Sequence, residues 1–284
     1  MNRRSFLKKA LGSILAVAGL SGTTYYYARE IEPSSLYINE NVIASPSIPP
    51  AFNQFKIVQF SDTHLGFQYT LDQLNELVRT INDLQPDMIV FTGDLVDEPH
   101  LYHWDNRLID ILRSLQAQYG KYWIYGNHDH GGYGTEIVLD VMEQAAFTLL
   151  KNSHTLIEKE NAMFILAGID DVLLGKPDVQ EALHNVNPDA FTILLAHEPD
   201  YADKTIDFPV DIQLSGHSHG GQIRLPFFGD VYTPAYAEKY VEGKYTIQNG
   251  KLDLYVNKGI GTTRVPYRFL CQPEIHLFTL MNQA

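Results

Sequence analysis

The sequence predicts an α/β domain in which mixed sheets are covered by helices on the outside. Short apolar runs of strand length alternate with apolar positions at helical spacing, and strand patterns dominate the end of the chain. The 284 residues are 45% hydrophobic, so the chain can bury a sizeable core. The sequence has no repeat of fixed period, which argues against a solenoid.

The individual elements follow from apolar spacing and turn signals. A helix is expected over 71–81, because apolar residues recur there at helical spacing after Thr70, which is placed to cap its start. A hairpin is expected over 244–256, with its turn at Asn249 and Gly250. The remaining expected strands cover 55–60, 87–91, 121–125, 163–168, 191–197, 210–216 and 274–280, and the remaining helices 107–118 and 136–146.

Residues 1–30 have the layout of an export leader. Arg3, Arg4, Lys8 and Lys9 precede a short apolar run over 10–20 that glycine and serine dilute. The twin arginine followed by SFLK resembles the signal of the twin-arginine translocase, and an ordinary membrane anchor is the alternative. We therefore expect export by this route, with the translocase as a transient partner, to an extracytoplasmic place in the cell wall or at the membrane.

Cleavage of the leader stays open, because AVA at 16–18 resembles a cleavage site whereas the tyrosines of 25–27 suit an uncleaved segment. Residues 31–52, rich in proline and serine at their far end, are expected to form a linker or an extended arm. A single domain is expected over 53–284. Its lone cysteine, Cys271, excludes an internal disulfide and suits a buried, inert thiol.

The charge balance limits the classes of partner. The formal net charge is −13, from 34 acidic and 21 basic side chains, which is the wrong sign for general binding to nucleic acid or to an anionic membrane. No nucleic acid partner is expected.

Polar clusters follow five of the expected strands, at the point where each strand ends. In α/β sheets, ligands bind in the crevice outside the carboxyl ends of the strands, so these clusters can converge. Their residues are Asp62, His64, Asp94, Asn127, His128, Asp129, His197, His217 and His219.

Carboxylates, an amide and imidazoles together form a mixed nitrogen and oxygen donor set for Mn, Fe, Zn or a similar divalent ion. No cysteine or methionine contributes, which argues against a thiolate site. The donors are too many for one tetrahedral ion and suit two ions that share a carboxylate.

The order of these clusters resembles the calcineurin-like metallophosphoesterases. Their pattern runs D-x-H, G-D-x-x-D, G-N-H-[DE], a single histidine and G-H-x-H, and all of its elements stand here in that order, with Asp97 as the second aspartate of G-D-x-x-D. GHSHGGQ (216–222) and the segment 259–275 resemble the YkuE-type branch, whose members can be exported by the twin-arginine route.

The resemblance implies a four-layer α/β/β/α sandwich with two mixed sheets and two divalent metal ions per chain, with Mn favoured and Fe or Zn as alternatives. It implies that Asp62, His64 and His219 hold the first ion, that Asn127, His197 and His217 hold the second, and that Asp94 bridges them. A hydroxide between the ions would attack phosphorus in line.

The remaining cluster residues receive roles by the same resemblance. His128 would donate to a phosphoryl oxygen or protonate the leaving group, and Asp129 would orient its other nitrogen. Asp97 would stabilise the loop. Arg264 and Arg268 suit a substrate phosphate, although a carboxylate near the final strand is an equally good partner for Arg268. The loop 96–106 is expected to be an ordinary loop, with a substrate lid as the alternative.

The expected function is that of an exported, metal-dependent phosphoesterase, with phosphodiesters favoured over monoesters. Its substrate would be a phosphoester or pyrophosphate of the cell envelope, such as a lipid-linked or wall-polymer species. A nucleotide phosphodiesterase and a non-catalytic metal-binding envelope protein are the alternatives. The sequence leaves the substrate and the oligomeric state open.

Overall fold

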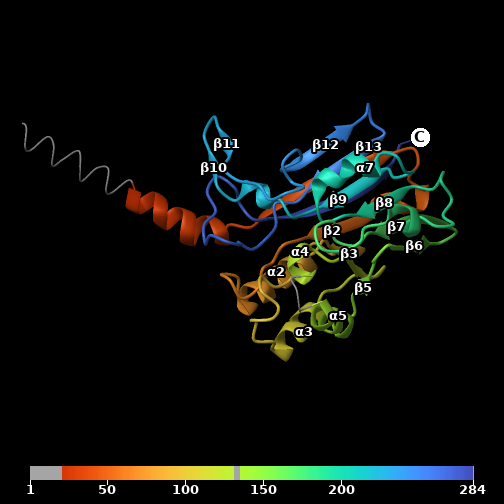
Figure 1. Cartoon of the computed structure of the whole chain (residues 1–284). Helices are drawn as coiled ribbons and strands as arrows, with labels where there is room; N and C mark the ends of the chain where they lie inside the picture. The colour runs from red at the N-terminus through yellow and green to blue at the C-terminus, as the bar shows by residue number, and fades with distance from the viewer. Residues whose placement is uncertain (1–20, 131–134, 284) are drawn as a thin grey trace, which may run out of the picture.

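The computed structural model describes residues 21–130 and 135–283. These residues form two six-stranded mixed sheets with helices on the outer faces (Figure 1). The expected fold class is confirmed.

The first sheet is mainly parallel. Only the β14–β2 pair is antiparallel, while β1 pairs with β14, and β2, β3, β4 and β5 pair in succession, in parallel. Its strands lie in the order β1 (Tyr37–Ser45), β14 (Glu274–Asn282), β2 (Lys56–Phe60), β3 (Met88–Phe91), β4 (Lys121–Trp123), β5 (Thr148–Leu149).

The second sheet has a parallel centre and an antiparallel hairpin at each edge. The expected hairpin over 244–256 is one of these edges, and the strand β6 at the other edge was not expected. The order is β12 (Gly243–Ile247), β13 (Leu252–Val256), β9 (Ile212–Ser215), β8 (Thr192–Leu195), β7 (Ala162–Gly168), β6 (Ser153–Lys159).

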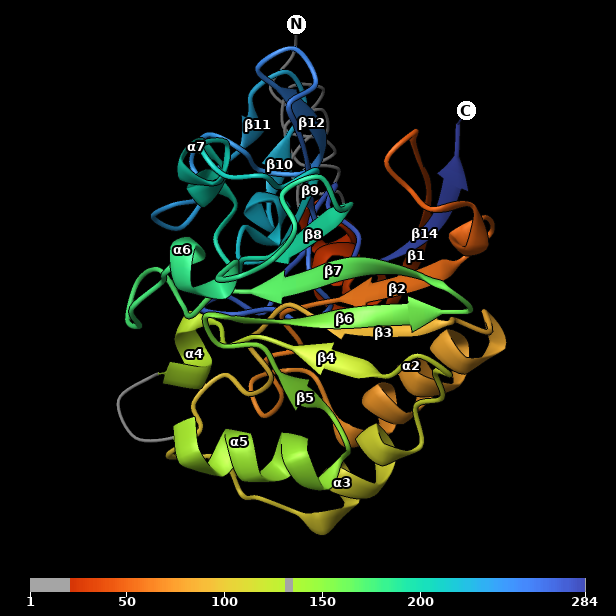
Figure 2. The ribbon, with the colours of Figure 1, turned by 90° about the vertical axis from the view of Figure 1, so that its right-hand side faces the viewer.

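Helices α2 (Leu71–Asp83), α3 (Asn106–Arg113) and α5 (Thr135–Gln144) cover the first sheet, as Figure 2 shows. Thr70 caps α2 in a reciprocal capping box with Gln73, as its position predicted. The short helices α6 (Val179–Ala182) and α7 (Ala202–Thr205) pack on the second sheet, and α4 (Asn127–His130) follows β4.

Three apolar clusters among the described residues separate the layers. Because side chains alternate along a strand, Val58 and Phe60 of β2 face the helices while Ile57 faces the second sheet. Leu194 of β8 faces α6 and α7 in the third cluster. The order of layers is therefore helix, sheet, sheet, helix.

Residues 31–52, expected to form a linker or an extended arm, contribute a strand to the first sheet. β1 pairs in parallel with β14 along its whole length, with Tyr37 opposite Glu274, and Ile48 and Phe52 are fully buried. β1 is an edge strand in which only Ile43 is buried, and its partner lies at the far end of the sequence. Its local apolar signal is accordingly weak.

The first 20 residues of the expected leader lie outside the described residues, but the following ones pack on the domain. In η1 (Tyr27–Ile31), the Ala28 carbonyl accepts a hydrogen bond from Arg268 N at 2.9 Å. The buried Glu32 carboxylate accepts hydrogen bonds from the backbone N–H groups of Leu270 and Cys271. Within the described residues, no helix combines the length and the apolar character that crossing a membrane requires.

Candidate metal centre

The parallel strands of both sheets deliver the polar clusters to one place. In the first sheet, Asp62 follows β2, Asp94 follows β3 and Asn127 follows β4. In the second sheet, His197 follows β8, and the segment with His217 and His219 follows β9. The predicted convergence at the carboxyl ends of the strands therefore occurs between the two sheets.

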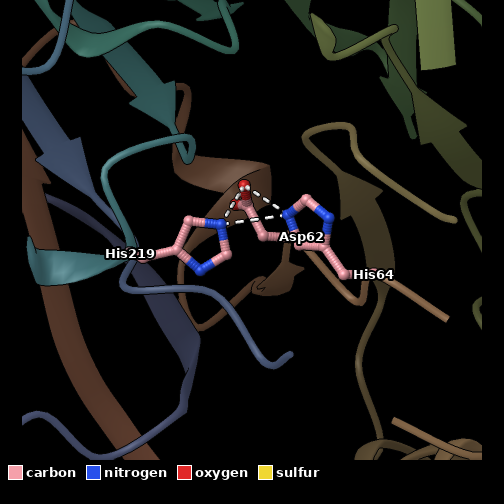
Figure 3. Close-up of side chains that lie close together, drawn as sticks. All are labelled: Asp62, His64 and His219. Atoms are coloured by element: carbon pink, nitrogen blue, oxygen red, sulfur yellow. Dashed lines mark hydrogen bonds and ion pairs between the residues drawn. The ribbon is translucent and has the colours of Figure 1, made fainter. Parts of the chain in front are cut away.

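The first donor group consists of Asp62, His64 and His219, all buried (Figure 3). The Nε2 atoms of His64 and His219 face each other at 3.0 Å. Asp62 Oδ1 lies 3.9 Å from His64 Nε2 and 3.5 Å from His219 Nε2. All three donor atoms thus point at one small volume.

The second donor group consists of Asp94, His197 and His217. Asp94 Oδ2 lies 3.3 Å from His197 Nε2 and 3.5 Å from His64 Nε2, so one carboxylate oxygen reaches both groups. That position suits a carboxylate shared by two ions.

Buried polar atoms that lack a hydrogen-bond partner show whether these residues fit a metal, because a metal ion would satisfy them. His197 Nε2 and Asn127 Oδ1 are buried and make no hydrogen bond within the described part of the chain, although such atoms are normally satisfied. Imidazole nitrogens with carboxylate and amide oxygens are a suitable set for divalent transition ions. The donor set therefore fits two such ions.

Neighbouring backbone groups fix the orientation of these imidazoles. The Thr92 carbonyl lies 2.6 Å from His197 Nδ1, and the Ala235 carbonyl lies 3.0 Å from His217 Nε2. The Cys271 thiol donates to the His219 carbonyl at 3.2 Å and holds that segment from behind. Such outer contacts fix the ring orientation of metal-binding histidines.

The backbone at the centre is unusual. Asp62, His64, Asp94, His217 and His219 all have positive φ, between 43° and 66°. Residues other than glycine rarely adopt this conformation, and it concentrates at functional sites where the surrounding fold enforces it.

Two glycines leave room for the carboxylates. A Cβ on Gly126 would lie 2.3 Å from Asp94 Oδ1, and a Cβ on Gly216 would lie 2.4 Å from Asp62 Oδ2. The glycine in GHSHGG before the first histidine is therefore required by close approach of an aspartate from the other sheet.

The electrostatics of the centre set the protonation of its imidazoles. Burial lowers the pKa of His217 to about 3 and keeps this imidazole neutral. Burial also disfavours a charged His197, but the negative charges of Asp94 and Asp62 outweigh it and raise the pKa of His197 well above its usual range. A cation bound here displaces that proton, since a ligating imidazole must be neutral.

His128 stands beside the donor groups and lines the pocket in front of them. Its backbone N–H donates to Asp94 Oδ1 at 2.8 Å, and its Nδ1 lies 2.6 Å from the Asp97 carbonyl. That carbonyl can only accept, so Nδ1 carries a proton. Burial disfavours a charged ring, but the negative charges of Asp94 and Asp97 outweigh it and raise the pKa of His128, which favours the protonated ring with a second proton on Nε2.

The expected role of Asp129 as the partner of His128 is wrong. Asp129 is fully buried and accepts hydrogen bonds from the backbone N–H groups of Asp94, Leu95 and Gly126. It joins two of the loops that carry the site. Asp97 instead orients His128 through its carbonyl and lies 3.0 Å from His64 Nδ1 through its carboxylate. In the sequence, the signal for this role of Asp97 is its position as the second aspartate of G-D-x-x-D.

The site opens into a pocket of about 580 Å³. Asp94, Asn127, His128, His217 and His219 form its floor. The walls are largely apolar and include Leu173, Ile223, Val231, Pro234, Ala235 and Val265, with Tyr232, Thr263 and Arg264 beside them.

The two arginines differ in role. Arg264 is exposed at the pocket wall, where it donates to the Tyr232 hydroxyl at 2.6 Å. Arg268 is fully buried and reaches neither a phosphate nor a carboxylate, so both expectations for it are wrong. Its guanidinium donates to the backbone carbonyls of Lys258, Gly259, Gly261 and Cys271.

The loop 96–106 does not line the pocket. Tyr102 and Trp104 pack against the core beneath the first sheet, and Trp104 Nε1 donates to the Pro99 carbonyl at 3.0 Å. These contacts are those of an ordinary loop, apart from Asp97 at its beginning.

Comparison with known proteins gives a consistent result. Residues 55–221 match the calcineurin-like phosphoesterase family. The chain is 48% identical to the uncharacterized metallophosphoesterase YkuE of Bacillus subtilis (strain 168), over 99% of this chain and 98% of that protein.

Two further relatives carry an activity in their names. The phosphodiesterase YaeI of Escherichia coli (strain K12) is 28% identical over 99% of this chain and 100% of that protein. The UDP-2,3-diacylglucosamine pyrophosphatase LpxG of Chlamydia muridarum (strain MoPn / Nigg) is 28% identical over 93% of this chain and 94% of that protein.

Proposed function

Because this chain belongs to the calcineurin-like phosphoesterase family, and is therefore a metal-dependent phosphoester hydrolase, we propose that it is a phosphodiesterase of the cell envelope. The observation that carries the proposal is the position of Asp94 Oδ2, within 3.5 Å of one imidazole nitrogen from each donor group. This position suits the carboxylate shared by two ions.

The residues around that carboxylate would hold the metal ions. Two divalent ions, with Mn favoured and Fe or Zn as alternatives, would supply an activated water and neutralise charge on the phosphoryl group. Asp62, His64 and His219 would hold one ion, Asn127, His197 and His217 the other, and Asp94 both.

His128 serves the leaving group. Its Nδ1 is engaged by the Asp97 carbonyl, so in the protonated ring Nε2 is the atom that would donate to a phosphoryl oxygen or give its proton to the departing oxygen. Asp129 holds the Asp94 and Gly126 backbones and so sets the position of the loops that carry Asp94 and His128. The largely apolar pocket walls exclude water from one side of the ester.

The cellular address rests on the N-terminal sequence. A twin arginine before an apolar run supports export by the twin-arginine translocase, to the cell wall or to the outer side of the membrane. An envelope phosphodiester or pyrophosphate, lipid-linked or in a wall polymer, is the substrate that this address favours. The names of the relatives YaeI and LpxG motivate testing a diester and a pyrophosphate.

Hydrolysis of bis-p-nitrophenyl phosphate beside p-nitrophenyl phosphate tests the proposal. The protein is stripped of metal and reloaded separately with Mn²⁺, Zn²⁺ and Fe²⁺. We expect metal-restored turnover that is faster with the diester, and UDP-glucose serves as a pyrophosphate probe. Preference for the monoester would contradict the phosphodiesterase assignment. Two bound ions with no turnover of any of the three substrates would favour the non-catalytic alternative.

A further inference from the structure

The hairpin of β10 (Arg224–Leu225) and β11 (Gly229–Asp230) carries large apolar side chains into solvent. Phe227 is completely exposed and Phe228 is 86% exposed, although phenylalanine is usually buried. Leu225, Val231 and Tyr232 of the same hairpin region are also exposed. We refer to residues 225–232 as the hairpin tip.

The exposed apolar surface continues from the hairpin tip to the N-terminal segment. Arg224 N donates to the Phe269 carbonyl at 2.8 Å, and the Phe269 ring contacts the Tyr27 ring. Tyr25 and Tyr26, which directly precede Tyr27, are more than half exposed. Figure 1 places the hairpin and this segment at the same end of the molecule.

The pocket of the metal centre opens beside this surface. Val231, Tyr232 and Val265 are exposed and also line the pocket wall. Phe227 and Phe228 are not part of that wall, so they serve neither the pocket nor the core.

Charge contributes little at this end. Arg264 is exposed beside the pocket, but the hairpin tip itself carries the exposed Asp230. The other two basic residues of 258–273 are not available to a partner, because Arg268 is fully buried and Lys258 Nζ lies 3.3 Å from Glu274 Oε2. The net charge of −13 disfavours adsorption driven by charge, so the apolar side chains and the tyrosines give this surface the chemistry of a membrane interface.

The sequence that precedes this end of the molecule also favours a lipid bilayer as the binding partner. The described residues begin at Ser21, directly after an apolar run over 10–20 that four basic residues precede. Residues 1–20, whose composition favours contact with a bilayer, therefore precede the end of the fold where the tyrosines and the hairpin tip are exposed. A protein partner would have no such reason to meet both features.

We propose that the hairpin tip and Tyr25–Tyr27 dock on a lipid bilayer, with Phe227 and Phe228 inserted among the acyl chains. The pocket mouth then faces the lipid headgroups. Access to amphiphilic phosphoesters held in that bilayer is the consequence for catalysis, and this part rests on the proposed function. Docking itself does not depend on it.

Tryptophan fluorescence in vesicles tests the docking. Phe227→Trp in the full chain is mixed with vesicles of phosphatidylcholine and phosphatidylglycerol (3:1) whose acyl chains carry bromine. Leu101→Trp, at a residue 72% exposed on the loop before α3, is the matched control. The two native tryptophans give the same background in both variants. We expect more than half of the added emission to be quenched at 227 and almost none at 101.

Other results would overturn the proposal. Equal quenching at positions 227 and 101 would show that the protein does not bind the bilayer preferentially through the hairpin tip. A protein that floats with vesicles but shows no quenching at 227 would be anchored only by its N-terminal sequence. A concentration-dependent dimer that Phe227→Ser with Phe228→Ser abolishes, without quenching at 227, would assign the surface to a second copy of the chain.

Solution turnover separates this proposal from the proposed function. The Phe227→Ser, Phe228→Ser variant should hydrolyse bis-p-nitrophenyl phosphate within about twofold of the unmodified chain, since neither side chain lines the pocket. Loss of quenching with normal turnover overturns docking alone, whereas quenching without diester turnover overturns the phosphodiesterase assignment alone.

Discussion

At the scale of single residues, the hydrogen bond at Nδ1 of His128 determines which atom is available to the substrate. The Asp97 carbonyl at 2.6 Å from Nδ1 fixes the ring, and His128 lines the pocket, so Nε2 is the nitrogen that remains for a ligand. His128 falls only in a third donor group, with His64 and Asp97, and not in the two groups that would hold the ions, so its chemistry can be removed without removing a ligand of those two groups.

His128→Ala is expected to leave metal content unchanged and to lower kcat for the diester by about 10²-fold or more, the usual scale of general acid catalysis. Elemental analysis and steady-state kinetics measure the two quantities. Bis-p-nitrophenyl phosphate has a good leaving group, so a diester with an alkyl leaving group should show a larger loss. Equal losses for both esters would exclude protonation of the leaving oxygen by His128.

The sequence predicted which residues form the site, but it did not predict several of their hydrogen-bond partners. The D-x-H, G-N-H and G-H-x-H patterns identified residues that the fold does bring together, because strand ends meet in parallel sheets. Which aspartate orients His128 depends on how a loop turns back, and Asp97 does so rather than Asp129. Burial of Arg268 among carbonyls likewise depends on the coil at 258–271, which has no periodic signal.

At the scale of elements, the N-terminal segment is a structural support of the centre. Glu32 binds the backbone of Leu270 and Cys271, and the Cys271 thiol in turn binds the His219 carbonyl. A chain of contacts thus runs from Glu32, just after the expected leader, to a candidate ligand. Cleavage after AVA at 16–18 would leave this support in place.

Glu32→Gln is expected to lower the free energy of unfolding by about 1–3 kcal/mol, because two buried N–H groups lose part of their acceptor. Chemical denaturation of the metal-free protein measures the effect. Glu30→Gln is the matched control, since Glu30 is exposed and its change should be within about 0.5 kcal/mol. Similar values for the two variants would contradict a supporting role of Glu32.

The strands with continuous apolar runs were predicted well, and the polar or edge strands were not. β3 and β8 are buried and consist almost entirely of apolar residues, while β2 and β9, also buried, each include one buried glutamine among their apolar residues. β1 and β6 lie at sheet edges, and most of their residues are partly exposed. Only pairing with distant partners identifies such strands, and a single sequence does not display it.

At the scale of the whole molecule, the metal centre joins the two sheets. Asp62 and Asp94 follow strands of the first sheet, while His197, His217 and His219 follow strands of the second. Ions held between them would link the layers and bind only the folded state, since the ligands are far apart in the sequence.

Addition of Mn²⁺ to the stripped protein is therefore expected to raise its Tm, by an amount equivalent to about 2.7 kcal/mol when free metal is 100 times Kd. In Asp94→Ala the rise should vanish, and elemental analysis should show loss of both ions, because the shared carboxylate belongs to each. Asp189→Ala, at an exposed carboxylate, is the control and should respond like the unmodified chain. Full occupancy in Asp94→Ala would refute the bridge.

The place of β14 between β1 and β2 has a consequence for biosynthesis. Tyr37 pairs with Glu274, and β2 pairs with the other side of the same final strand, so the first sheet stays divided until residues 274–282 have been synthesised. Contacts between positions so distant in sequence form slowly. The ribosome must translate residues 274–282 before the domain can close, and a truncated product lacking this strand will present unpaired strand edges to chaperones and proteases.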